Sequence, residues 1–478
     1  MNSFDEFAFF LKLKVGINMD IVVFGTGKKY QKNRAWLQGH NIVALLDNDV
    51  NKQGTTMDGV LIVSPEKICD LQYDYIVILS VYIDEMVAQL QKLGVNRQLV
   101  LDGSDLGLLN RIKETYYYGV KPRGARKRLV LISWDMSLSG AQIVLMYAAE
   151  ILIQNEYDVI VVSSDDGPLR DECVKRHIPV IIDENIKYSK LADLPWVADI
   201  DMVFLNTFNM HYLLVRRNKD IPVLWWIHES PVFETYFPGY QKTLDRISMD
   251  NIYTYTVGAM PYEWISKTKI NSTYCGMLPY GLPDMECKII VKSPKDRLIF
   301  ATVGWVCERK SQDILYHAIK KLPDDIKSAC EFWVVGCDEN EMGEWLHQMA
   351  SSTPELKIMG QLDRDEIQKL YTEIDVLLCP SREDTMPVVV NEAMMNCIPV
   401  VVSDKVGNAK YITEKVNGLV VSVDAESLAE GIKWCVRNRD KLDSIGKRGR
   451  KVFEDEFSLP AFSKRLLQYV EGALNHGK

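Results

Sequence analysis

Residues 380–394 read PSREDTMPVVVNEAM and are followed by the apolar run Ile398–Ser403. Asp384 and Thr385 are residue types that cap helices, and Pro387 is tolerated in a first helical turn. The sequence therefore predicts a helix that begins just after Asp384, with a buried strand behind it.

The predicted helix has one carboxylate before its start, Asp384, and one inside it, Glu392. The free N–H groups at a helix start attract phosphate. A carboxylate would repel phosphate, so we expect Asp384 to accept hydrogen bonds from sugar hydroxyls. Glu392, about 12 Å farther along the axis, is expected to reach a ribose. A capping Asp and an exposed helical Glu also occur together without any ligand.

The stretch from Asp375 to Val402, with the order DVLLCPSRED…EAMMNCIPVVVSD, resembles the donor-site signature of glycosyltransferase family 4. That family carries two acidic residues eight apart. Asp384 stands where most members have Glu, and Met386-Pro387 replace the usual Phe-Gly pair. The resemblance implies that Asp384 and Glu392 act in catalysis, and that the donor also contacts Thr385, Met386, Pro387 and Val388.

Length and composition indicate three globular domains, since a chain of 478 residues is too long to fold around a single hydrophobic core. No apolar run is long enough to cross a bilayer, and the first residues lack the order of an export signal. We therefore expect a cytoplasmic protein. The ten cysteines show no Cys-x-x-Cys spacing, and some, such as Cys379 and Cys435, lie in apolar runs. This pattern indicates reduced thiols.

The net charge of −9 argues against nucleic acid as a partner. One basic cluster exists, made of Lys121, Arg123, Arg126, Lys127 and Arg128. It is either a solvated linker, which we favour, or a contact with anionic lipid at the inner face of the membrane.

Residues 1–120 are expected to form a small N-terminal Rossmann-like α/β domain. A strand Ile21–Phe24 leads into Gly25-Thr26-Gly27, and acids follow at Asp47 and Asp49. The place of the third glycine of a dinucleotide fingerprint is taken by Tyr30, so a structural or ligand-sensing role is favoured over redox chemistry. The other predicted strands are Ile42–Leu46, Tyr75–Leu79 and Gln98–Leu101.

Residues 125–290 repeat the alternation of strand and helix. Ser139-Gly140-Ala141 opens a helix after the strand Arg128–Trp134. Gly140 either allows close helix packing or, as the resemblance implies, approaches the donor phosphates.

The strand Val223–Ile227 ends in His228, at the sheet edge where open α/β folds bind ligands. His228 alone could be a satisfied polar group. The family places a His near the donor sugar and acceptor hydroxyl, so we expect His228 to position substrate. Asn206 and Thr207 are weaker candidates for the same cleft.

Residues 295–455 would form a third α/β unit, the nucleotide-sugar donor lobe. Its first strand, Leu298–Gly304, leads to Arg309 and Lys310, and Ser311 is expected to cap the next helix. Two cations beside free N–H groups favour a diphosphate site over a solvated turn. In the family one cation usually follows the glycine directly, where this chain has Trp305. Residues 456–478 predict an amphipathic helix that crosses back to the acceptor-side lobe of residues 125–290.

The resemblance covers residues 125–478 and implies two facing Rossmann-like lobes, the glycosyltransferase B fold. It implies a retaining hexosyltransferase that moves a sugar from a nucleoside diphosphate sugar, with UDP-sugar favoured, to a glycan or lipid-linked acceptor hydroxyl in cell-surface polysaccharide or glycoconjugate synthesis.

Neither a cofactor nor a metal is expected, because no suitably placed loop carries an Asp-x-Asp triplet. A sugar-nucleotide epimerase of the same fold and a catalytically silent sugar-nucleotide-binding partner stay open, as does oligomer formation.

Overall fold

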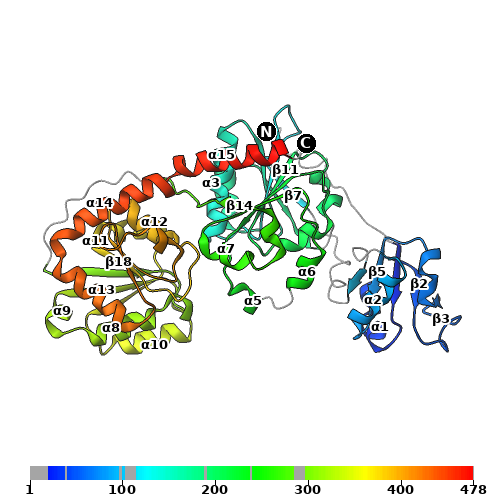
Figure 1. Ribbon diagram of the computed structural model, residues 1–478, viewed down its shortest axis with the longest axis horizontal. Helices are drawn as coiled ribbons and strands as arrows, with labels where there is room; N and C mark the ends of the chain where they lie inside the picture. Colours follow the sequence, from blue (N-terminus) through cyan, green and yellow to red (C-terminus); the bar gives the residue numbers. More distant parts are fainter. Residues whose placement is uncertain are drawn as a thin grey trace, which may run out of the picture.

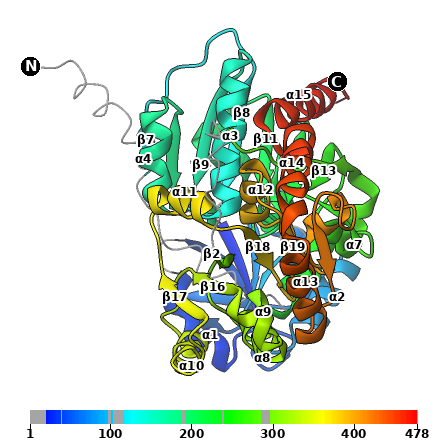
Figure 2. The same cartoon turned by 90° about the vertical axis from the view of Figure 1, so that its left-hand side faces the viewer.

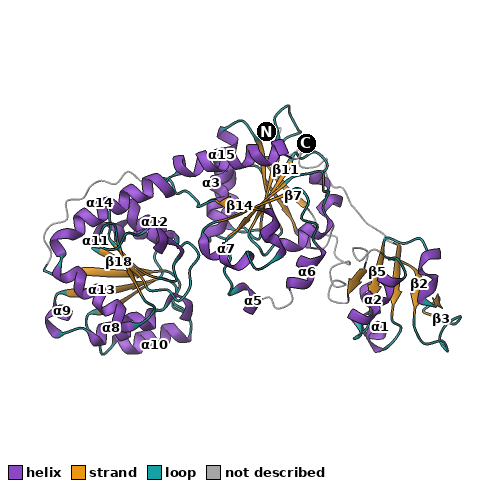
Figure 3. Cartoon of the chain, in the orientation of Figure 1, coloured by secondary structure: helices purple, strands orange, loops and turns teal. Residues whose placement is uncertain are grey.

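A computed structural model describes residues 20–37, 40–95, 100–102, 115–187, 191–236, 240–284 and 296–476. Within them the strands form three sheets, each flanked by helices (Figures 1 and 3). The predicted α/β class and the two Rossmann-like lobes after a small N-terminal α/β unit are confirmed.

The N-terminal sheet has the order β3-β4-β2-β1-β5-β6. Its central strand is apolar and fully buried from Ile21 to Phe24, which explains why the sequence alone locates it. The antiparallel pair β3–β4 was not predicted, and residues 98–99 of the predicted last strand lie outside the described residues. The elements are β1 (Asp20–Phe24), α1 (Lys28–Asn33), β2 (Asn41–Leu46), β3 (Thr56–Met57), β4 (Val60–Val63), β5 (Tyr75–Ile78), α2 (Ile83–Lys92) and β6 (Val100–Asp102).

The middle sheet has the order β14-β13-β12-β11-β8-β9-β10-β7. Its strands are β7 (Thr115–Tyr118), β8 (Arg128–Ser133), β9 (Asp158–Ser163), β10 (Val180–Asp183), β11 (Met202–Asn206), β12 (Val223–Ile227), β13 (Ile252–Thr256) and β14 (Tyr274–Met277). Its helices are α3 (Gly140–Gln154), α4 (Pro168–Lys175), α5 (Phe233–Tyr236), α6 (Tyr240–Arg246) and α7 (Ala259–Ile265).

The edge strand β7 pairs antiparallel with β10, so residues 115–118 belong to the middle sheet. The expected boundary near residue 120 is wrong by this one strand. Pairing with a strand some sixty residues later is a tertiary contact, which local sequence pattern does not encode.

The third sheet is parallel, with the order β17-β16-β15-β18-β19-β20. Its strands are β15 (Leu298–Val303), β16 (Cys330–Val335), β17 (Leu356–Gly360), β18 (Val376–Cys379), β19 (Val400–Ser403) and β20 (Leu419–Val421). Its helices are α8 (Gln312–Lys321), α9 (Asp324–Ser328), α10 (Glu341–Ala350), α11 (Arg364–Glu373), α12 (Val388–Met395), α13 (Ala425–Arg437) and α14 (Leu442–Val452).

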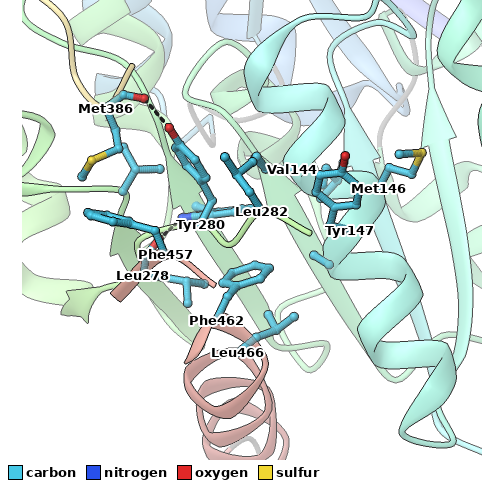
Figure 4. Packing of buried hydrophobic residues seen from close by; sticks show 14 of the residues in the cluster. Val144, Met146, Tyr147, Leu278, Tyr280, Leu282, Met386, Phe457, Phe462 and Leu466 are labelled. Atoms are coloured by element: carbon cyan, nitrogen blue, oxygen red, sulfur yellow. Dashed lines mark hydrogen bonds between the residues drawn. The ribbon is translucent and has the colours of Figure 1, made fainter. Parts of the chain in front are cut away.

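The last helix, α15 (Leu459–His476), leaves the third unit and crosses to the middle sheet, as predicted (Figure 1). Phe462 stacks on Trp226 with ring centroids 5.6 Å apart, and Tyr469 stacks on Tyr255 at 4.2 Å. One continuous apolar cluster therefore joins the two lobes, and Figure 4 shows Phe457, Phe462 and Leu282 packed within it.

The basic cluster after β7 is largely neutralised by nearby acids. Arg123 contacts Asp201 at 2.8 Å, and Arg128 contacts Asp158 at 2.7 Å. Lys127 lies 3.7 Å from Asp201 as well. These pairs support the interpretation of the segment as a structural linker.

No helix among the described residues combines the length and apolar character needed to span a bilayer. The cysteines that the structure describes are free thiols, with Cys379 and Cys435 buried as expected.

Candidate functional site

The starts of α3 and α12 face each other across the two lobes. Gly140 is the first residue of α3, and a Cβ added there would lie 3.5 Å from Cγ2 of Val388, the first residue of α12. Free N–H groups at a helix start form an anion site. The predicted residues Gly140 and Val388 are thus brought together.

The predicted caps of α12 are wrong. The N-cap position is Pro387, and no side chain caps the helix. Asp384 instead lies in extended chain, where its N–H donates to the carbonyl of Lys405 at 3.1 Å and its carbonyl accepts from Gly407 N–H at 2.8 Å. Pro387 fixes an extended approach to the helix, so the capping residue types lie too far upstream to act.

Asp384 is buried and binds both predicted cations. Its Oδ2 lies 2.5 Å from Lys310 Nζ and 3.4 Å from Arg309 Nη1. Two positive charges and one negative charge leave an excess of one positive charge. Asp384 is expected to accept hydrogen bonds from sugar hydroxyls. The ion pairs add a second role, because this carboxylate also positions Lys310 and Arg309.

The loop that carries these cations is braced from the neighbouring loop. Arg382 binds Asp313 through two guanidinium contacts of 2.8 and 2.6 Å, and its Nη1 donates to the carbonyl of Glu308 at 2.7 Å. Ser311 occupies the N-cap position of α8 but does not cap it, contrary to prediction. Its Oγ accepts from the backbone N–H of Arg382 at 2.9 Å instead.

Glu392 lies on α12 and is half-buried. The hydroxyl of Tyr371, on α11, donates to its Oε2 at 2.7 Å. Burial, with the Glu392 charge as second cause, raises the pKa of Tyr371 well above its ordinary value, so this phenol stays a donor. The Tyr371 hydroxyl thus orients the carboxylate of Glu392, whose oxygens act only as acceptors when it is ionised.

His228 follows β12, and its Nε2 is buried without a hydrogen-bond partner among the described residues. Its ring meets that of Trp226 edge-on, with centroids 4.4 Å apart. Burial lowers the pKa of His228 to about 3, so the imidazole is neutral near pH 7. A buried neutral imidazole with a free nitrogen can bind one substrate hydroxyl.

The end of β11 adds further unpartnered polar atoms. Asn206 Oδ1 and Thr207 Oγ1 are both buried without a partner in the described chain. Thr207 has a φ of 75°, an outlier for a β-branched residue. Such strain is characteristic of ligand sites. The Asn206 amide donates to the carbonyl of Ala141 at 3.0 Å, which ties this edge to the start of α3.

Glu229 holds these loops in place. Its Oε2 accepts from the backbone N–H of Phe208 at 2.7 Å and of His228 at 3.1 Å. Burial raises the pKa of this carboxyl, although these hydrogen bonds oppose the shift.

Met386 makes a hydrogen bond between the two lobes, whereas Thr385 packs against Gly407 of its own lobe. Met386 is buried, and its carbonyl accepts from the Tyr280 hydroxyl at 2.7 Å (Figure 4). A Cβ on Gly407 would lie 1.7 Å from the Thr385 carbonyl oxygen, so only glycine fits there. That both residues contact the donor, as the resemblance implies, stays a prediction.

Sequence reasoning missed Tyr371, Arg382 and the bridging role of Tyr280. Each acts through a partner at least twenty residues away in the chain. No local pattern marks them. No cluster of three or more metal-ligating side chains occurs within the described ranges.

Comparison with known proteins assigns each of the three units to a sequence family. The family described as "Glycosyl-transferase family 4" matches residues 125–271, and "Glycosyl transferases group 1" matches residues 286–452. The family "C2185-like, N-terminal" matches residues 17–101.

Curated relatives include a lipopolysaccharide core biosynthesis glycosyltransferase of Rhizobium meliloti, 25% identical over 37% of this chain and 51% of that protein. The alpha-1,3/1,6-mannosyltransferase ALG2 of Mus musculus is 30% identical over 54% of this chain and 65% of that protein. The chain spans about half the length of the first curated relatives, 51% and 47%.

Among solved structures, Anabaena HepE in complex with UDP and glucose has a TM-score of 0.60 at 16% identity, covering 73% of this chain and all of that one. The lipopolysaccharide glycosyltransferase WaaG has a TM-score of 0.55 at 15% identity, covering 71% and 98%. At these identities the likeness establishes the glycosyltransferase B fold alone.

Proposed function

The chain belongs, through residues 125–271 and 286–452, to the family 4 and group 1 glycosyltransferases, and from this premise we propose that it transfers a hexose from a nucleoside diphosphate sugar. The acceptor would be a hydroxyl of a glycan or lipid-linked precursor. The names of the lipopolysaccharide and ALG2 relatives support cell-surface polysaccharide or glycoconjugate synthesis.

One observation carries this proposal. The starts of α3 and α12 converge at Gly140 and Val388, and the Lys310, Arg309 and Asp384 group adds an excess positive charge. A departing diphosphate develops negative charge, which preorganised donors and cations stabilise. We assign this task to Lys310 and the two helix starts, without a metal ion.

The remaining residues take roles that follow from their surroundings. Glu392, oriented by Tyr371, would accept from a ribose hydroxyl. His228 would position the donor sugar and the acceptor hydroxyl through its unpartnered nitrogen. With no protein nucleophile in these roles, we propose that a leaving phosphate oxygen takes the acceptor proton on the same face, so that transfer retains the anomeric configuration.

A silent sugar-nucleotide-binding partner is the second candidate, favoured by Trp305 at the position where the resembled family has a cation. The two candidates differ in turnover. The silent partner would bind donor without releasing nucleoside diphosphate in the presence of any acceptor.

Thermal unfolding with a panel of nucleotide sugars tests the proposal. A true donor at 100 times its dissociation constant adds about 2.7 kcal/mol to the unfolding free energy. Lys310→Ala and Glu392→Ala should each abolish this shift. A full shift in either variant, or strict dependence on magnesium, contradicts the proposed site.

A further inference from the structure

A second candidate binding site lies on the donor lobe outside the Lys310 and Asp384 network. It is a groove of about 740 Å³ between the first turns of α8 and α10. The two helices lie side by side at the lower end of the molecule in Figure 2. The side chains that decide its chemistry are Trp305, Glu308, His317, Asn340, Glu341 and Trp345.

Trp305 presents an open aromatic platform. Trp305 directly follows Gly304 in the chain, and 59% of its surface is exposed. The backbone around it is fixed, because Gln312 Nε2 donates to the Trp305 carbonyl at 3.2 Å and Val306 N–H donates to the Cys337 carbonyl at 2.9 Å. The indole of Trp305 is therefore held at the surface by a fixed backbone, where it lines the groove.

Trp345 forms a second, supported aromatic wall. Its ring meets Tyr316 edge-on, with centroids 5.4 Å apart, and His317 lies 6.2 Å away. The groove therefore has one indole from α10, Trp345, and one from the segment that precedes α8, Trp305, which is the more exposed of the two.

The groove is acidic. Glu308 and Glu341 are exposed, and no ion pair is described for either within the structure's described ranges. Asp313 also lines the groove, but its charge is matched by Arg382 at 2.6 Å. Exposed carboxylates repel phosphate, and of Glu308 and Glu341 only the charge of Glu308 interacts with a cation of the described chain, Arg382, so we do not regard this groove as an extension of the diphosphate site.

We propose that this groove binds a neutral saccharide segment of a glycan chain. A sugar ring has an apolar face of C–H groups, which packs on the electron-rich face of an indole. Its hydroxyls can donate to the carboxylates of Glu308 and Glu341, which are acceptors only. An organic cation fits less well, because such ligands are enclosed by several rings, whereas Trp305 is open to solvent.

The groove adjoins the donor loop without sharing its cations. Glu308 begins the turn Glu308–Lys310, and the Glu308 carbonyl accepts from Arg382. A glycan bound here would be held next to the transfer site. Binding of the glycan in this groove does not depend on the proposed sugar transfer.

Saccharide binding to the full chain provides the test. Maltotriose, mannotriose and triacetylchitotriose are titrated while tryptophan fluorescence and saturation-transfer NMR are recorded. We expect at least one to bind, and Trp305→Ala to raise its dissociation constant about tenfold. Glu341→Gln should weaken binding severalfold, whereas Glu344→Gln, on the same helix but outside the groove, should not.

Four outcomes overturn the proposal, three of which concern the sugars and UDP. These are failure of all three trisaccharides to bind, unchanged affinity in Trp305→Ala, and competition by UDP. Saturable binding of tetramethylammonium in place of the sugars also overturns it. Lys310→Ala separates the two proposals, since it should abolish nucleotide binding and leave trisaccharide binding unchanged.

Discussion

The two halves of the proposed site differ in how their polar groups are held. On the donor lobe the predicted charged site residues are held by partners, Lys310 by Asp384 and Glu392 by Tyr371, although Glu383 Oε1 is buried without a hydrogen-bond partner. On the acceptor-side lobe, polar atoms such as His228 Nε2 and Thr207 Oγ1 are buried without partners.

This difference separates two physical tasks. Charges that meet a diphosphate must be fixed beforehand, because reorganisation during the reaction would cost free energy. Neutral groups without a partner in the protein make binding selective for a ligand with a hydroxyl. A ligand that lacks the hydroxyl leaves these groups unpaired, at a cost of about 1–3 kcal/mol. We therefore expect donor-side variants to lose donor binding together with turnover, and acceptor-side variants to lose turnover alone.

The largest expected effect is that of Lys310→Met. Removing one preorganised charge from a transition state typically costs about 10²–10³-fold in rate. The change also leaves Asp384 with Arg309 alone, so the unfolding free energy should fall by about 2 kcal/mol. Steady-state kinetics and denaturant unfolding measure the two effects.

The double variant Lys310→Met with Asp384→Asn is the matched control. It removes the uncompensated carboxylate and should recover the unfolding free energy, but not turnover. Recovery of turnover would contradict a direct role of Lys310 with the diphosphate.

His228→Ala should lower kcat by about tenfold to a hundredfold, the cost of one lost hydrogen bond to a buried group. Donor affinity should stay within twofold, because the donor-lobe contacts are untouched. Isothermal titration with the donor, set beside kcat, checks this division. Weakened donor affinity with normal kcat would erase the contrast between the lobes.

Much of the scaffold could be predicted from the sequence, because each strand is a local apolar run. The strand Val223–Ile227 and the position of His228 after it were predicted to the residue. The helix start at residue 388 was not, because Thr385 and Asp384 are drawn into extended chain by contacts with Lys405 and Gly407. The pairing of Asp384 with Lys310 spans 74 residues and depends on β15 lying beside β18.

Tyr371→Phe tests whether orientation of Glu392 matters. It removes one hydrogen bond from a carboxylate that stays in place, so donor affinity should fall about fivefold, corresponding to about 1 kcal/mol. The donor affinity of Glu392→Gln should fall further, since this change weakens the group that accepts the hydrogen bond from the ribose hydroxyl. Titration of the same nucleotide sugar compares the two. Equal affinities in Tyr371→Phe and the unchanged protein would mean that Glu392 needs no positioning.

The smallest expected effect concerns the protonation of His228. Its pKa of about 3 in the folded chain lies below the ordinary 6.5, so the unfolded chain binds the proton more tightly. His228 therefore contributes stability that is fully present above pH 6.5 and is lost as pH falls from 6.5 towards 3. Between pH 6 and 8 turnover should not follow a His228 titration. In NMR spectra of isotope-labelled histidine, the signal that disappears in His228→Asn should stay that of a neutral ring down to pH 5. A titration midpoint near pH 6.5 for that signal would show that the imidazole is solvated. His228 would then not be a buried, unpartnered group, and the contrast between the two lobes would not hold for it.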